Sequence, residues 1–216
     1  MGADKEMTLA AERPEAVLFD LDGVLIDSEN LYTEFWDKTE RLYPTGIDNF
    51  ARAIKGTNLD SILKLFKPEE RDEILSRILD FDSHLTYPLF PGALELLARL
   101  QKEQIPAALV TSSNPEKMEQ LFRQYPDFER YFTAIVNGSM VSRGKPDPEG
   151  YLLAAKLLGK APERCLVIED SLQGVRAGRA AGCRVWGLTT TLPAATIAPD
   201  ANRIFPDIAA ASAALH

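Results

Sequence analysis

The most regular feature of the chain is a series of short apolar runs, each followed directly by small or polar residues. The runs lie at residues 16–19, 106–110, 134–136, 165–168 and 184–188. Apolar and polar residues do not alternate within them, which is typical of strands covered on both faces and therefore of parallel strands. We expect these runs to form a parallel sheet.

The segments between the runs carry the signals of helix starts. Asn114 is an N-cap residue followed by a proline at the first helical position. Asp147 with Pro148 repeats this pair, and Ser171 is placed to open a third helix. Strands that alternate with helices predict an α/β fold, in which an open sheet has helices on both faces.

Residues 30–87 break this alternation, because they show helical periodicity and no convincing strand. Their apolar positions lie among charged residues, at Leu31, Phe35, Ile62, Leu65, Phe66, Ile74, Ile78 and Leu79. We interpret the segment as an all-helical insertion that leaves the sheet after its first strand. Residues 1–29 and 88–216 would then form the α/β core.

Composition and charge narrow the class of protein. The 216 residues have a formal net charge of −8, which argues against nucleic acid or an anionic membrane as the main partner. No apolar run approaches the roughly 18 residues of a membrane span, and residues 1–14 have no signal-peptide core and are expected to form a frayed tail. Cys165 and Cys183 lack metal-ligand spacing, which favours two buried, reduced thiols in a cytoplasmic protein.

The residues best suited to chemistry stand directly after the apolar runs, where ligands bind in open α/β sheets. They are Asp20 and Asp22 after the first run, Thr111 and Ser112 after the second, Lys145 beyond the third, and Glu169 and Asp170 after the fourth. If these strands are neighbours, four carboxylates converge and raise one another's pKa values. A hard divalent cation would relieve the repulsion, and Mg²⁺ suits a site that also leaves room for a phosphate.

Phosphoryl transfer gives each of these residue types a role. A carboxylate can attack phosphorus and form an acyl-phosphate, which divides a difficult displacement into two easier steps. A second, protonated acid supplies the proton that an alkoxide leaving group needs and can later deprotonate the attacking water. A hydroxyl, backbone N–H groups and an ammonium can hold the phosphoryl oxygens. The pattern therefore favours phosphoryl transfer.

The same residues belong to an ordered set of four segments. The set comprises FDLDGVLIDS at 19–28, Thr111 after an apolar run, Lys145 within GKPDP, and EDS at 169–171. In this order the segments resemble the four motifs of the haloacid dehalogenase (HAD) superfamily. The resemblance implies a Rossmann-like core with a helical cap inserted after the first motif. It is closest to the branch that contains β-phosphoglucomutase and small sugar-phosphate phosphatases.

The resemblance also implies catalytic and metal-binding roles. Asp20 would be the nucleophile and Asp22 the general acid and base, with the backbone carbonyl of Asp22 on Mg²⁺. Asp170 would be a Mg²⁺ ligand, and Glu169 would be a ligand either directly or through water.

A phosphate-binding role follows from the second and third motifs. The resemblance implies that Thr111 and Lys145 hold the phosphate, and we expect Ser112 to contribute its backbone N–H. Ser113 and Asn114 are interpreted as residues that cap the following helix.

Three further residues near the motifs are expected to have mainly structural roles. Asp27 and Ser28 are expected to cap the first helix of the insertion. Gly23 would let the backbone turn away from the strand.

The choice between phosphatase and mutase depends on the insertion. In the β-phosphoglucomutase branch the cap carries a histidine shortly after the first motif and an arginine after a Lys-Gly pair. Here Tyr32 stands at the place of the histidine, and Lys55-Gly56 is followed by TNLD without an arginine. The missing cation for a second phosphate favours a Mg²⁺-dependent phosphatase acting on a small monoester, such as a sugar phosphate. A mutase is the alternative.

A non-catalytic phosphoryl-accepting or binding protein on the same fold is a further alternative. A receiver domain also gathers aspartates, a hydroxyl and a lysine around Mg²⁺, but it has no helical insertion and needs no acid two residues after the acceptor. The expected partner is a small phosphorylated metabolite, whose identity depends on cap contacts that no motif encodes. A monomer is the default, because the cap already covers the site.

Overall fold

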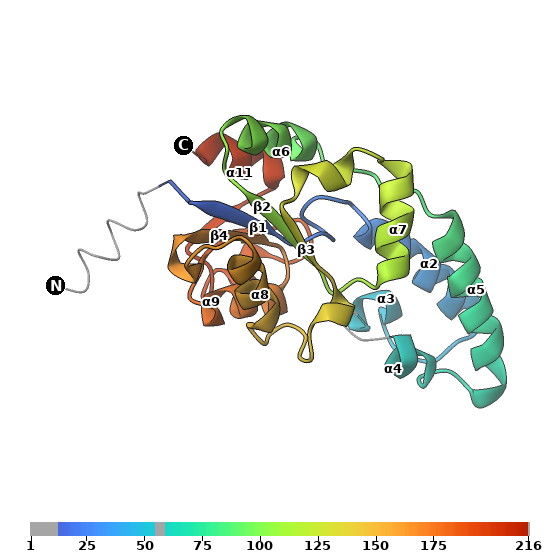
Figure 1. Cartoon of the computed structure of the whole chain (residues 1–216). Coiled ribbons are helices and arrows are strands. Elements are labelled where there is room, and N and C mark those ends of the chain that lie inside the picture. Colours follow the sequence, from blue (N-terminus) through green and yellow to red (C-terminus); the bar gives the residue numbers. More distant parts are fainter. Residues whose placement is uncertain (1–12, 55–58, 216) are drawn as a thin grey trace. The chain divides into compact units, whose positions relative to one another are not determined.

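A computed structural model describes residues 13–54 and 59–215 of the chain (Figure 1). These residues divide into two compact units, the core unit of residues 13–27 with 88–215 and the helical unit of residues 28–87. The expected N-terminal tail up to residue 12 lies outside the described residues, as does the segment 55–58 that contains the Lys-Gly pair.

The centre of the core unit is a parallel sheet whose six strands, within the described residues, lie in the order β3-β2-β1-β4-β5-β6. The strands are β1 (Ala16–Phe19), β2 (Ala107–Val110), β3 (Ala134–Val136), β4 (Cys165–Glu169), β5 (Arg184–Leu188) and β6 (Arg203–Phe205). The five predicted strands are confirmed, and every neighbouring pair is parallel. The sequence pattern does not indicate β6, because only Ile204 and Phe205 of this strand are apolar and it begins with the exposed Arg203.

Helices cover both faces of the sheet, which makes the fold Rossmann-like, as predicted (Figure 1). On one face lie α8 (Glu149–Leu157) and α9 (Leu172–Ala180), and on the other lie α6 (Ala93–Lys102) and α11 (Ile208–Ala214). The core unit also contains α7 (Pro115–Gln124), α10 (Ala194–Ile197) and the 3₁₀ helices η2 (Phe128–Tyr131), η3 (Gly138–Met140) and η4 (Pro162–Arg164). Because both faces are covered, every residue of β1 and β4 is buried.

Two of the predicted helix starts in the core unit are confirmed. The side chain of Asn114 accepts a hydrogen bond from the backbone N–H of Lys117 at 2.9 Å and caps α7. The hydroxyl oxygen of Ser171 accepts one from the backbone N–H of Gly174 at 3.0 Å and caps α9. Each cap satisfies an N–H group that has no partner within its own helix.

The predicted helix start at Asp147 is wrong. Pro148 occupies the N-cap position, and α8 begins at Glu149. The Asp147 carboxylate accepts a hydrogen bond from the backbone N–H of Glu149, two residues further on, at 3.0 Å. An aspartate that bonds the backbone two residues ahead closes a turn of its own, so the helix starts after that turn.

The helical unit contains only helices in its described residues. They are α2 (Glu29–Leu42), α3 (Phe50–Ala53), α4 (Leu59–Leu63), η1 (Pro68–Glu70) and α5 (Arg71–His84). Its core contains a group of aromatic rings: the ring centroids of Trp36 and Phe66 lie 6.3 Å apart, and those of Phe50 and Phe66 lie 5.1 Å apart. Leu65 and Leu79, two of the apolar positions named in the sequence analysis, are exposed.

The expectation that the Ser28 side chain caps α2 is wrong. Ser28 occupies the N-cap position, but its side chain makes no capping hydrogen bond. Its φ of −90° and ψ of −18° are helical, whereas a capping side chain needs extended backbone at this position. The backbone N–H of Asp27 bonds the carbonyl of Pro88 at 2.8 Å.

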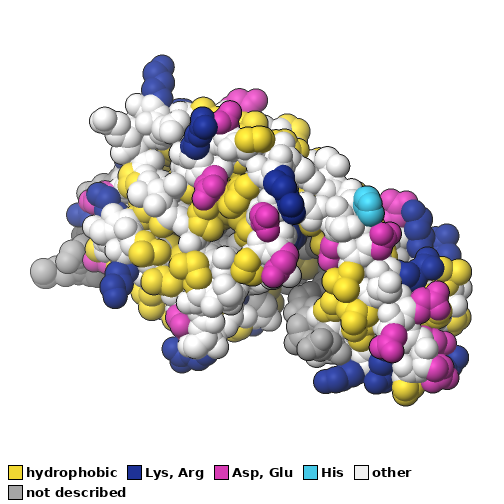
Figure 2. Space-filling model, turned by 45° about the vertical axis from the view of Figure 1, so that its right-hand side comes forward, with side chains coloured by type: hydrophobic (Ala, Val, Ile, Leu, Met, Phe, Trp, Pro, Cys, Tyr) yellow, Lys and Arg dark blue, Asp and Glu magenta, His cyan; other side chains and the backbone are white. Residues whose placement is uncertain are grey.

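The face of the molecule shown in Figure 2 is mixed in charge. Acidic and basic side chains are interspersed on the face shown in Figure 2, so this face has no broad field of one sign. No helix among residues 13–54 and 59–215 is long and apolar enough to cross a membrane.

Candidate functional site

The sheet topology brings the predicted chemical residues to one edge of the core unit. Strands β2, β1 and β4 are adjacent and parallel, so their carboxyl ends meet at the same edge. Asp20 follows β1, Thr111 follows β2, and Asp170 follows β4. All three side chains belong to buried residues. The structure therefore unites residues that are up to 150 positions apart in sequence.

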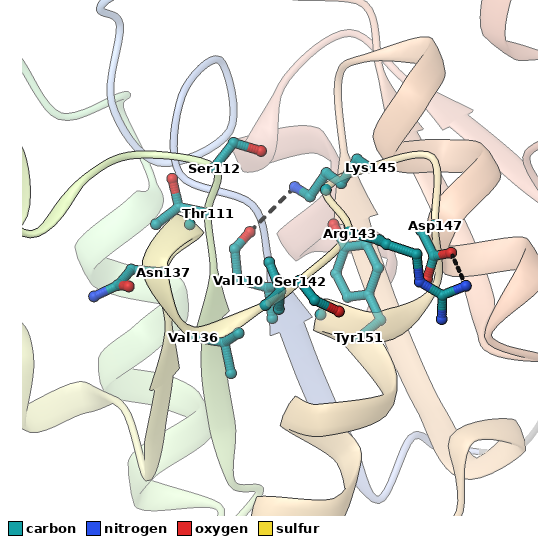
Figure 3. Close-up of a pocket in the computed structure, with 14 residues that line it drawn as sticks. Val110, Thr111, Ser112, Val136, Asn137, Ser142, Arg143, Lys145, Asp147 and Tyr151 are labelled. Carbon is teal, nitrogen blue, oxygen red and sulfur yellow. Dashed lines mark hydrogen bonds and ion pairs between the residues drawn. The ribbon is translucent and has the colours of Figure 1, made fainter.

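The Lys145 side chain joins the ends of three strands. Its Nζ donates to Asp20 Oδ1 at 2.5 Å, to Glu169 Oε1 at 2.6 Å and to the carbonyl of Val110 at 3.1 Å. The last of these bonds is drawn in Figure 3. Three acceptors match the three protons of an ammonium, so Lys145 is held in one place.

Glu169 is fully buried and uses both of its carboxylate oxygens. Oε1 accepts from the hydroxyl of Tyr151 at 3.0 Å, in addition to Lys145. Oε2 accepts from the backbone N–H of Asp170 and from the backbone N–H and hydroxyl of Ser171, at 2.9–3.0 Å. Five donors compensate the burial of this carboxylate.

Two glycines make room for the acidic side chains. A Cβ at Gly174 would lie 1.6 Å from Glu169 Oε1, and a Cβ at Gly23 would lie 1.9 Å from Asp170 Oδ2. Gly23 also has a φ of +79°, in the region that side chains disfavour. Gly23 therefore has the expected structural role in a turn and also lies directly against the Asp170 carboxylate.

The acidic cluster has raised pKa values. Burial raises the pKa of Asp20 to about 7; Lys145 opposes this shift, and Glu169 and Asp22 add to it. Burial, Glu169 and Asp20 also raise the pKa of Asp170 well above its usual range. Burial disfavours the charge on Lys145, but the two neighbouring carboxylates outweigh burial and raise its pKa. Three carboxylic acid groups thus share a single ammonium in a buried site.

The cluster has the donor chemistry of a site for a hard cation. One carboxylate oxygen from each of Asp20, Glu169 and Asp170 lies within 4.8 Å of the others. Carboxylate oxygens are the ligands that Mg²⁺ prefers. The residues present therefore fit the predicted Mg²⁺.

Asp22 lies beside this cluster and is held by the segment after β2. Its Oδ1 accepts from Lys117 Nζ at 2.5 Å, and its Oδ2 accepts from the Ser113 hydroxyl at 3.0 Å. The interpretation of Ser113 as a capping residue is wrong, because Asn114 is the N-cap of α7. Sequence reasoning also did not single out Lys117. The available signal was a cation in the first turn of a helix, where positive charge is unfavourable.

A cavity of about 260 Å³ opens beside Lys145. Figure 3 shows Thr111, Ser112 and Lys145 at one end of it and Tyr151 along its wall. Thr111 is buried, and its hydroxyl oxygen accepts from the backbone N–H of Ser113 at 3.0 Å, whereas Ser112 is exposed. The three predicted phosphate-binding residues thus lie together.

The chain is similar to known proteins in sequence. Residues 14–182 match the family model described as haloacid dehalogenase-like hydrolase. Over 197 residues the chain is 35% identical to a phosphorylated carbohydrates phosphatase from Thermotoga maritima, covering 82% of this chain and 87% of the relative. Over 181 residues it is 34% identical to hexitol phosphatase A from Escherichia coli, covering 80% and 82%.

A solved structure is similar over nearly the whole chain. It is a HAD family hydrolase from Deinococcus radiodurans with bound phosphate and sodium. The TM-score is 0.78 at 33% identity, and the match covers 94% of this chain and 96% of that one.

Proposed function

Since the chain belongs to the haloacid dehalogenase-like hydrolases, we propose that it is a Mg²⁺-dependent phosphatase that forms an aspartyl-phosphate on Asp20. That it is a phosphoric monoester hydrolase follows from the family and from its phosphatase relatives. The proposed substrate is a sugar phosphate or a similar small metabolite, in line with relatives named for phosphorylated carbohydrates and hexitols.

The observation that carries the proposal is the junction of Asp20, Lys145 and Asp170 at adjacent strand ends. A buried carboxylate bound by a lysine at 2.5 Å is oriented for attack. The same lysine supplies positive charge for the oxygens of an incoming phosphate.

The reaction would proceed in two displacements. In the first, an oxygen of Asp20 attacks phosphorus, the P–O bond to the leaving group breaks, and Asp22 gives its proton to the leaving oxygen. In the second, Asp22 takes a proton from a water molecule whose oxygen attacks phosphorus. The bond to Asp20 then breaks, and inorganic phosphate leaves. The enzyme returns to its starting state after each cycle.

Phosphate and metal would be held by the remaining residues. Lys145, the Thr111 hydroxyl and the backbone N–H of Ser112 would bind the phosphoryl oxygens. The carboxylates of Asp20 and Asp170 and the backbone carbonyl of Asp22 would hold Mg²⁺. When bound, Mg²⁺ neutralises negative charge on the carboxylates and on the transferring group.

Glu169 would act on the metal through water rather than directly. Both of its oxygens are already engaged by five donors, and direct ligation would cost some of these bonds. Its main contribution would be to position Lys145 and the loop that carries Asp170.

The helical unit, residues 28–87, would serve as the cap that selects the substrate. Binding residues in enzymes often lie on segments that close over a rigid core. We propose a cytoplasmic enzyme, where Cys165 and Cys183, which are free and buried, would stay reduced.

The test is phosphate release from a panel of sugar phosphates, phosphoglycolate and nucleotides, with Mg²⁺ and with EDTA. We expect turnover with Mg²⁺, its loss in EDTA, and no turnover by Asp20→Ala or Asp20→Asn. The matched control is Asp127→Asn, because Asp127 is an exposed residue of the core unit. Most of the activity surviving in Asp20→Ala would refute the mechanism.

Two alternatives predict different products. A mutase would convert β-glucose-1-phosphate to glucose-6-phosphate faster than it releases phosphate. A phosphoryl-accepting switch would be labelled stoichiometrically by p-nitrophenyl phosphate without steady turnover. Steady phosphate release without isomerisation is the result we expect.

A further inference from the structure

The carboxylate of Asp22 is held at both oxygens by residues outside the four motifs. Lys117 Nζ lies 2.5 Å from Oδ1, and the Ser113 hydroxyl donates to Oδ2 at 3.0 Å. Ser113 and Lys117 both lie in the segment that follows β2, more than 90 positions from Asp22. The orientation of Asp22 is therefore set by a different part of the core unit.

Lys117 is unusual for its place in α7. Asn114 is the N-cap, and its side chain accepts from the Lys117 backbone N–H at 2.9 Å, so Lys117 lies in the first turn. A cation at this end of a helix is opposed by the helix dipole. The Lys117 side chain is only 16% exposed, and that of Asp22 is 33% exposed. A residue placed against a local preference, as this lysine is at the start of a helix, is expected at functional sites.

Ser113 is itself fixed by the backbone around it. Its N–H donates to the Thr111 hydroxyl oxygen at 3.0 Å, and its carbonyl accepts from the Gly138 N–H at 3.0 Å. The second donor to Asp22 is therefore also held in one position. Two fixed donors on two oxygens leave the carboxyl group little freedom to rotate.

We propose that Lys117, assisted by Ser113, is a positioning residue that orients the Asp22 carboxyl toward the leaving-group oxygen of the substrate. The inference rests on the proposed function, in which Asp22 protonates that oxygen. General acid catalysis requires the acid to lie within hydrogen-bond reach of the atom that it protonates. Small displacements of a positioned group can cost about a hundredfold in rate.

A comparison of two leaving groups distinguishes a misplaced Asp22 from a general loss of structure. An alkyl phosphate releases a poor alkoxide that needs a proton, whereas p-nitrophenyl phosphate releases a stable phenolate that does not. The value of kcat/KM reports the steps up to the first irreversible transfer, here phosphorylation of Asp20. A misplaced Asp22 should therefore lower kcat/KM for the alkyl ester selectively.

The experiment compares Lys117→Met with the wild type on two substrates. They are the sugar phosphate that the wild type hydrolyses fastest and p-nitrophenyl phosphate. We expect kcat/KM for the sugar phosphate to fall about tenfold or more, while the value for p-nitrophenyl phosphate stays within about twofold. Lys117→Arg should recover most of the loss, since it keeps the charge. Arg123→Met, which removes an exposed cation from the same helix, is the control and should match the wild type.

Two further variants keep the test decisive if Lys117→Met folds poorly. Lys117→Gln should show the same selective loss, and Ser113→Ala should show a smaller one, with melting temperatures measured for each. An equal loss on both substrates, or no loss, would overturn the inference.

Failure of this inference can be told apart from failure of the proposed function. If Asp20→Ala and Asp22→Ala are inactive but Lys117→Met behaves like the wild type, only the positioning role of Lys117 is wrong. If Asp20→Ala keeps its activity, the proposed mechanism itself is wrong.

Discussion

The contact between Gly174 and Glu169 allows a sharp prediction, because it reverses the usual effect of a helix substitution. Gly174 lies inside α9, where alanine normally stabilises a helix by about 1 kcal/mol relative to glycine. Here a Cβ would lie 1.6 Å from Glu169 Oε1 and 1.9 Å from its carboxyl carbon. We expect Gly174→Ala to destabilise the protein.

The magnitude follows from the bonds that Glu169 would lose. Real Cβ contacts are not shorter than 3.0 Å, so the Glu169 oxygen would have to retreat by about 1.4 Å. That shift breaks its bonds to Lys145 and Tyr151, which lie at 2.6 and 3.0 Å. Disrupting a buried ion pair typically costs about 3–5 kcal/mol. After subtracting the helix gain of about 1 kcal/mol, we expect a net loss of about 2–4 kcal/mol.

Urea or thermal unfolding would measure this loss. In a protein of this size each 1 kcal/mol lowers the melting temperature by about 2–4 °C, so the expected decrease is about 4–16 °C. The neighbouring Gln173, exposed on the same helix, supplies the control. The variant with alanine at position 173 should be more stable than the variant with glycine there. At position 174 the protein with glycine should be the more stable one. Alanine favoured at both positions would show that Glu169 does not lie against Gly174.

The remaining predictions concern the metal and the thiols. Mg²⁺ at a hundred times its dissociation constant should stabilise the wild type by about 2.7 kcal/mol, measured by thermal unfolding. Asp170→Ala should remove this stabilisation and raise the Mg²⁺ concentration needed for activity, and an unchanged Mg²⁺ response would contradict the role of Asp170. Burial raises the pKa of Cys165 to about 11 and that of Cys183 to about 12. We therefore expect neither thiol to react with a disulfide reagent at pH 8 until the protein is unfolded, and rapid reaction of the native protein would contradict their burial.

The sequence predicted those parts of the fold that depend on local patterns. The apolar runs that became β1, β2 and β4 are buried along their whole length, so their composition carries the signal directly. The three-residue edge strand β6 has no such signal. Helix caps were predicted where a side chain bonds its own helix, as Asn114 does in α7. The prediction for Ser28 was wrong because a helical backbone conformation at that residue prevents its side chain from capping.

The candidate site was likewise predicted in part from local sequence patterns. Asp20, Thr111 and Asp170 were found because each directly follows a buried strand, and parallel strands end at a common edge. The sequence by itself thus determined which chemical groups meet there. The tertiary structure decided how they are held: Tyr151 bonds Glu169 from inside α8, and Lys117 reaches Asp22 from α7. Such bonds form between side chains that are distant in sequence, so they depend on how helices pack against the sheet, which no local pattern of residues encodes.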